Sequence, residues 1–166
     1  MFRSAKQKGL SYIVFAIYLI LLVWLVIFKF VTSLSELPHI RGINLIPFYY
    51  DVETGIHLKE VLYNIIVFIP LGVYAQVFGA DRKPWVKCLV FACVSLLFEV
   101  IQFIFAIGAS DITDLMGNTL GGAFGILLCV LMKKLAPRKF ISVINALGVT
   151  IEIAAIGLLL LLLAAN

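Results

Sequence analysis

Charged residues are scarce in this chain. Only 13% of its 166 residues are Asp, Glu, Lys or Arg, whereas 63% are hydrophobic, and the mean hydropathy is +1.14. An ordinary soluble chain is about one quarter charged and about half apolar. This balance excludes a typical soluble domain and predicts an integral membrane protein in which residues 1–166 form a single membrane domain.

Histidine and cysteine are also scarce, with two and three residues. Cys88, Cys93 and Cys129 are odd in number, and their spacing matches neither a disulfide framework nor a metal site. The sequence contains no serine nucleophile with a paired base and no glycine loop of the kind that cradles phosphate. It therefore predicts no zinc centre and no bound organic cofactor.

Five hydrophobic segments are long enough to cross a bilayer, which takes about 20 mainly apolar residues. They cover about residues 10–31, 58–79, 85–107, 112–132 and 141–164. The first is too long for a signal peptide and lacks a small-residue cleavage site, so it is predicted to remain as an anchor. We expect an all-α bundle of five transmembrane helices with an outer loop at residues 32–57.

The distribution of positive charge predicts the orientation of this bundle. Ten of the thirteen Lys and Arg residues lie in the N-terminal tail or near the loops after the second and fourth segments: Arg3, Lys6, Lys8, Arg82, Lys83, Lys87, Lys133, Lys134, Arg138 and Lys139. Positive residues mark the cytoplasmic side of a membrane. We therefore expect a cytoplasmic N-terminus and an outer C-terminus, with membrane lipids rather than nucleic acid as partners.

The outer loop at residues 32–57 is unusually apolar and aromatic. Such a segment is expected to pack at the membrane interface or over the mouth of the bundle, where aromatic residues are favoured. Two cations on this side, Lys29 and Arg41, have two interpretations. In the first, they neutralise the acidic groups or bind a phosphate. In the second, which applies to Lys29 in particular, the long side chain simply extends to the membrane interface.

Polar residues in three of the segments are predicted to lie at a similar depth. At a rise of about 1.5 Å per residue, Asn64, Glu99, Gln102 and Asn118 fall roughly 7–12 Å below the outer surface, and Asp114 falls near the rim. Residues three or four positions apart share one face of a helix. These side chains are therefore expected to meet in a cavity that opens outward.

Most of these residues also have a purely structural interpretation. Taken singly, Asn64, Gln102 and Asn118 are better explained as residues that form hydrogen bonds between membrane helices. Asp111 and Asp114 stand at the start of the fourth segment, where acidic residues cap a helix and complement its dipole.

Glu99 is the strongest functional candidate, because a carboxylate inside a membrane is costly to keep. Glu99, Asp111 and Asp114 together offer hard oxygen ligands of the type that Mg²⁺ and Ca²⁺ prefer, which keeps a metal ion open as an alternative to no cofactor. Glu152 lies in the middle of the fifth segment and has no predicted partner.

Small residues and one proline indicate how the segments pack. Gly117, Gly121 and Gly125 are four residues apart and form a smooth strip that lets another helix approach closely. Packing within the chain is favoured over dimerisation, and the oligomeric state is not predicted. Pro70 is expected to bend the second segment near Ile66 and so open space beside Asn64.

Four motifs occur in a recognisable order: NLIPF at 44–48, NIIVFIPLG at 64–72, EVIQF at 99–103 and DITDLMGNTLGG at 111–122, followed by Gly125. In this order they resemble the VanZ-like family, over about half of the chain. The resemblance implies a small multi-helix protein of the bacterial cytoplasmic membrane. It also implies a link to resistance against teicoplanin, a lipidated glycopeptide.

The resemblance places the expected binding residues at the motif positions Asn44, Asn64, Glu99, Gln102, Asp111, Asp114 and Asn118. Many family members carry an arginine just before the acidic motif, whereas residues 107–110 of this chain contain none. The acidic group therefore lacks its usual counter-charge, so the resemblance does not imply the same ligand specificity.

Three functions fit these observations. The leading hypothesis is an outward-facing pocket that binds a lipidated antibiotic or a cell-wall lipid. The first alternative is a membrane hydrolase or transferase acting on a lipid-linked substrate, with Glu99 as general base and Asp111 and Asp114 orienting substrate or Mg²⁺. The second is a small transporter in which Glu99 cycles a proton.

Overall fold

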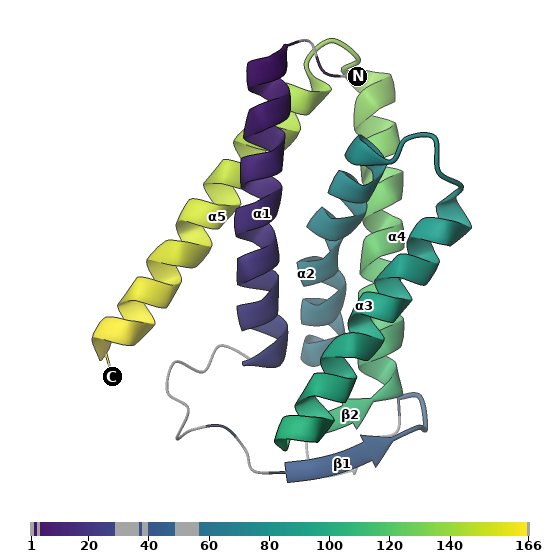
Figure 1. The fold of residues 1–166 in the computed structure, drawn as a ribbon, viewed down its shortest axis with the longest axis vertical. Coiled ribbons are helices and arrows are strands. Elements are labelled where there is room, and N and C mark those ends of the chain that lie inside the picture. The colour runs from purple at the N-terminus through teal and green to yellow at the C-terminus, as the bar shows by residue number, and fades with distance from the viewer. Residues whose placement is uncertain (1, 3, 29–36, 38–39, 49–56, 166) are drawn as a thin grey trace.

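The computed structural model describes residues 2, 4–28, 37, 40–48 and 57–165 and contains five long helices in this part of the chain (Figure 1). The helices are α1 (Ala5–Ile27), α2 (His57–Phe78), α3 (Pro84–Phe105), α4 (Ile112–Leu135) and α5 (Phe140–Ala165). Each is long and apolar enough to cross a membrane. The prediction of an all-α protein with five candidate spans is confirmed.

The predicted spans match the helices except at some ends. α1 begins at Ala5, earlier than predicted, because Ser4 caps it by accepting a hydrogen bond from the backbone N–H of Gln7. α4 continues to Leu135, and α2 runs unbroken through Pro70. Lys29, the end of the first predicted span and most of the predicted outer loop lie outside the described residues.

The third span is shorter than predicted. α3 ends at Phe105, because Ala106 adopts a left-handed backbone conformation with φ of 55°. Ile107, which was predicted to close the third span, instead begins a strand. The prediction of a helix to residue 107 is therefore wrong by two residues.

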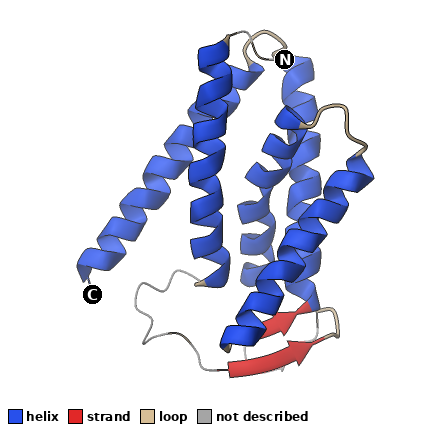
Figure 2. Ribbon diagram, viewed as in Figure 1, coloured by secondary structure: helices blue, strands red, loops and turns tan. Residues whose placement is uncertain are grey.

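Two short strands, absent from the sequence prediction, lie across one end of the bundle (Figure 2). β1 (Ile40–Asn44) and β2 (Ile107–Asp111) pair in parallel, with Ile40 opposite Ile107 and Asn44 opposite Asp111. Parallel strands need a long connection between them, and here α2 and α3 lie within it. The pair therefore fixes the NLIPF motif beside the start of α4.

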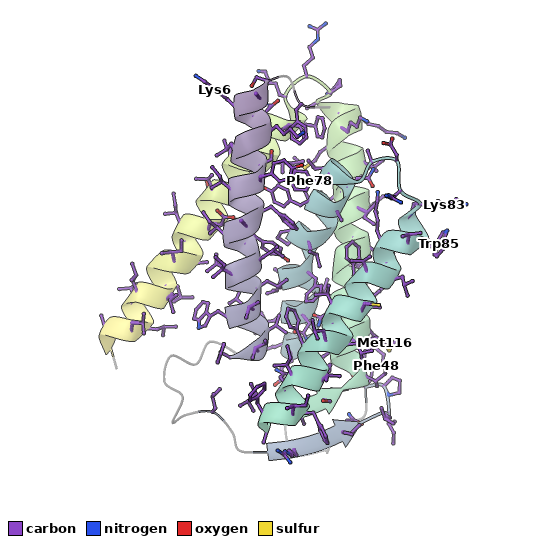
Figure 3. All side chains as sticks on the ribbon, viewed as in Figure 1. Lys6, Phe48, Phe78, Lys83, Trp85 and Met116 are labelled. Carbon is purple, nitrogen blue, oxygen red and sulfur yellow. The ribbon has the colours of Figure 1, made fainter. Side chains whose placement is uncertain are left out.

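The basic residues gather at the end of the bundle opposite the strands. Figure 3 labels Lys6 and Lys83 at this end, whereas Phe48 and Met116 lie near the strand pair. The chain termini lie at opposite ends (Figure 1). This arrangement is the one that the charge pattern requires, and the cytoplasmic location of the basic end stays a prediction.

Helices α2 and α4 are in close backbone contact. A Cβ added to Gly121 would lie 2.2 Å from the carbonyl oxygen of Ile65, and one added to Gly125 would lie 2.1 Å from that of Ile69. From the other side, a Cβ on Gly72 would lie 1.9 Å from the carbonyl oxygen of Gly122. The glycine strip thus faces α2 of the same chain and brings the two backbones into contact.

Helix α5 packs mainly against α1 and diverges from the bundle toward its C-terminal end (Figure 1). A polar seam joins the two helices: Ser11 Oγ donates to Asn145 Oδ1 at 2.9 Å, and Gln7 Nε2 donates to Ser142 Oγ at 3.0 Å. Glu152 is buried on α5, and its Oε1 has no hydrogen-bond partner among the described residues.

We predict that Gly121→Ala destabilises the protein by about 1–3 kcal/mol, the usual cost of overpacking a filled interior. The new methyl group would collide with the Ile65 carbonyl and force α2 away from α4. Thermal unfolding of the detergent-solubilised protein would measure the effect.

Gly157→Ala is the matched control, because a Cβ at Gly157 would meet nothing within 4 Å. This variant should unfold at the wild-type temperature or slightly above it, since alanine favours a helix over glycine. Equal melting temperatures for the two variants would contradict the close packing of α2 and α4.

Candidate functional site

A cavity of about 250 Å³ lies between α1, α2, α3 and α4, near the end that carries the strands. The structure places in its lining all five polar residues for which the sequence predicted a common depth. The lining residues are Leu25, Val26, Lys59, Glu60, Tyr63, Asn64, Glu99, Gln102, Asp114 and Asn118. Lys59, Glu60 and Tyr63 are exposed, whereas Glu99, Gln102 and Asn118 are buried.

Asp114 projects into this cavity from the first turn of α4. Its Oδ1 accepts a hydrogen bond of 2.6 Å from Nδ2 of Asn64 on α2. The two side chains meet because the glycine strip of α4 lies against α2. A Cβ at Gly117, one turn from Asp114, would lie 3.4 Å from the Cβ of Asn64. Asn64 thus orients the carboxylate at the wall of the cavity.

Glu99 is held at the junction of α3 and α4. Its Oε2 accepts a hydrogen bond of 3.1 Å from the backbone N–H of Asp111, and its backbone carbonyl accepts one of 2.9 Å from Ser110 Oγ. A carboxylate near a helix N-terminus is stabilised by the free N–H groups and the dipole of that helix. The start of α4 therefore supplies the favourable interaction that a buried Glu99 requires.

Two buried amides complete the inner wall. Nδ2 of Asn118 donates to Ser95 Oγ at 2.8 Å, which ties α4 to α3. Nε2 of Gln102 donates to the backbone carbonyl of Val26 at 3.0 Å, which ties α3 to α1. Oδ1 of Asn118 has no hydrogen-bond partner among the described residues, although Asn118 is 0% exposed.

Asp111 lies outside the cavity, so the structure separates the three acidic residues that the sequence grouped together. Its Oδ1 caps α4 by accepting from the backbone N–H of Thr113 at 2.7 Å. Its Oδ2 accepts a hydrogen bond of 3.1 Å from Nδ2 of Asn44 across the strand pair. The capping interpretation of Asp111 is confirmed, and Asn44 serves to fix β1 to it.

The NLIPF motif is fastened to the start of α4 at one further point, where Thr113 Oγ1 accepts from the backbone N–H of Phe48 at 3.1 Å. Within the motif, Oδ1 of Asn44 accepts from the backbone N–H of Ile46, also at 3.1 Å. Asn44 and Asp111 line a second, mainly apolar groove of about 250 Å³ on the other side of Glu99. Glu99 is shared by the groove and the cavity.

Sequence reasoning missed several residues of the site. Ser95 lies four residues before Glu99, and Glu60 lies four residues before Asn64. This spacing places each of them on the same helix face as a predicted site residue, so it would have indicated both. Lys59 and Tyr63 share the same spacing at the cavity mouth. The contact of Gln102 with Val26 carries no such signal, because α1 and α3 are distant in sequence.

Among the described residues, the hydrogen bond of Arg41 goes to the end of α3 rather than to an acidic side chain. Its guanidinium donates to the backbone carbonyl of Ile104 at 3.1 Å, where a cation complements the C-terminal end of α3. Across the described ranges of the chain, no group of three or more His, Cys, Asp or Glu residues is arranged to hold a metal ion. The described lining of the cavity therefore offers carboxylates and amides, with Lys59 at its mouth.

Comparison with known proteins agrees with this reading of the motifs. The sequence profile of the VanZ/LLP1 family matches residues 15–133, from α1 to the end of α4. The chain is also 40% identical to Protein VanZ of Enterococcus faecium over 145 residues, which cover 86% of this chain and 88% of that protein. No solved structure matches the chain.

We predict that Asp111→Ala loosens the strand pair and the start of α4. Loss of a helix cap costs about 1 kcal/mol, and loss of the hydrogen bond to Asn44 costs about as much again. Hydrogen–deuterium exchange should become faster at the backbone amides of residues 40–44 and 107–113.

Two control variants accompany this measurement. Asp111→Asn keeps an acceptor at the cap and should exchange more nearly as wild type, since asparagine caps helices as well as aspartate does. Asp81→Ala alters an exposed residue in the loop at the basic end and should change nothing at the strands. Unaltered exchange in Asp111→Ala would show that Asp111 does not hold this end together.

Proposed function

This chain belongs to the VanZ/LLP1 family, and on that premise we propose that it binds the polar part of a membrane amphiphile. The binding site is the cavity between α1, α2, α3 and α4. The ligand class is a lipidated glycopeptide antibiotic or a cell-wall lipid, and the protein contributes to teicoplanin resistance.

The convergence of polar groups from three helices is the observation that carries this proposal. Asn64, Glu99, Gln102, Asp114 and Asn118 line one cavity inside an otherwise apolar bundle. Carboxylates within a membrane segment are costly and mark functional sites. Hydrogen bonds between helices explain why the amide side chains are present. They do not explain why a cavity lies beside two carboxylates.

The volume of the cavity limits what it takes in. Pockets for drug-sized ligands measure about 300–1,000 Å³, and this cavity measures about 250 Å³. It fits a head group or one substituent of a larger molecule and is too small for a whole glycopeptide. The remainder of the ligand would stay at the membrane surface, and its lipid chain would lie in the outer leaflet beside the helices.

The location of the cavity also supports an outer-leaflet ligand. It lies toward the end of the bundle opposite the basic loops, with Lys59, Glu60 and Tyr63 exposed at its mouth. The positive-inside rule assigns that end to the outer side of the membrane. Glycopeptides and cell-wall lipids meet the membrane on that side.

We predict that a teicoplanin-sensitive Gram-positive host that expresses this protein tolerates more teicoplanin than one with an empty vector. Glu99→Gln and Asp114→Asn should each return the inhibitory concentration to the empty-vector value, because both remove a charge from the cavity wall at nearly constant shape. Broth dilution gives the inhibitory concentrations, and immunoblots of the membrane fraction give the protein levels.

Glu152→Gln is the matched control. Glu152 is buried in a membrane helix to the same extent as Glu99, with 6% and 5% of each residue exposed, but it lies outside the cavity. The Glu152→Gln variant should therefore retain full resistance to teicoplanin. Wild-type resistance in both Glu99→Gln and Asp114→Asn, at equal protein levels, would refute the proposed function of the cavity.

A further inference from the structure

We infer that the group taken into the cavity is a protonated primary amine, presented by an amphiphile. This inference rests on the proposed function and adds the chemistry of the ligand. It follows from the hydrogen bonds that the amide side chains of the cavity wall make within the protein, from the amide oxygen of Asn118 that has no partner, and from the charge of the lining.

The three amides of the wall all use their nitrogen atoms within the protein. Nδ2 of Asn64 donates to Asp114, Nδ2 of Asn118 donates to Ser95, and Nε2 of Gln102 donates to the Val26 carbonyl. Each bond uses one of the two N–H groups of its amide and directs the nitrogen toward the protein. The acceptor that the wall offers a ligand is therefore judged from the carbonyl oxygens.

Asn118 shows this most directly. It is 0% exposed and lines the cavity, and its Oδ1 has no hydrogen-bond partner in the described part of the chain. A buried carbonyl oxygen without a partner is rare and unfavourable. The amide nitrogen is directed at Ser95 Oγ, and the oxygen is the end of the amide that has no partner. A ligand N–H would satisfy the oxygen.

The charge of the lining favours a cation over an anion. Among the described residues that line the cavity, three are acidic (Glu60, Glu99 and Asp114) and one, Lys59 at the exposed mouth, is basic. A phosphate or carboxylate near Glu99 would meet like charge in a medium of low polarity, which is unfavourable. An ammonium group carries three donors and no acceptor, which matches this wall.

The experiment uses the full chain in phosphatidylcholine nanodiscs and three probes that share one alkyl chain: dodecylamine, dodecyltrimethylammonium and dodecyl phosphate. Isothermal titration calorimetry, corrected with empty nanodiscs, measures the binding. Dodecylamine should bind at least about tenfold more tightly than the other two, equivalent to about 1.4 kcal/mol. The trimethylammonium probe keeps the charge but has no N–H donor.

Variants assign this binding to the cavity. Glu99→Gln and Asn118→Leu should each weaken dodecylamine at least about tenfold, whereas Glu152→Gln should bind as wild type. If Asn118→Leu does not fold, Asn118→Asp serves in its place. It keeps the shape, adds negative charge, and should bind dodecylamine at least as tightly as wild type.

Two results would overturn the inference, and they differ in what they imply. Tighter or equal binding of dodecyl phosphate or dodecyltrimethylammonium, weakened by Glu99→Gln or Asn118→Leu, would leave the cavity as an amphiphile site but exclude selection of a primary amine. Binding of all three probes that no cavity variant changes, or no binding above empty nanodiscs, would refute both the inference and the proposed function.

Discussion

The first two turns of α4 form the structural centre of this protein. They receive or make hydrogen bonds with β1 through Asn44, with α2 through Asn64 and with α3 through Glu99 and Ser95. Each of the four sequence motifs thus contributes a polar side chain to one shared network. A helix N-terminus suits this role, because its free N–H groups and dipole stabilise acidic side chains that an apolar surrounding disfavours.

This network depends on close contact between helix backbones. Lipid tails are as apolar as leucine, so burial of hydrophobic side chains gives little reason for membrane helices to associate, and packing and hydrogen bonds must hold them together. The contact of Gly121 with Ile65 and of Gly72 with Gly122 supplies the packing. It also places Asn64 near enough to Asp114 for their hydrogen bond, so the same glycines that hold α2 to α4 shape the cavity wall.

Helix α5 stands apart from this arrangement. The cavity is lined by residues of α1 to α4, and the family profile ends at residue 133, before α5 begins. α5 instead joins α1 through the polar seam of Gln7, Ser11, Ser142 and Asn145 near the basic end. None of the described residues that line the cavity comes from α5, and Glu152 is a buried carboxyl group that the proposed function does not use.

The sequence by itself determined the five apolar helices, because hydropathy is a property of short stretches of chain. It offered Asp111 and Asp114 equally as helix caps or as site residues, and the common depth of the polar residues in the membrane stays a prediction. Only the tertiary structure decided that Asp111 faces Asn44 while Glu99 and Asp114 face the cavity. It also decided the pairing of β1 with β2, the placement of Arg41 at the end of α3, and the contact of Gln102 with Val26. These contacts join segments that are far apart in the sequence. They depend on how the whole bundle packs, and a local sequence pattern carries no information about that packing.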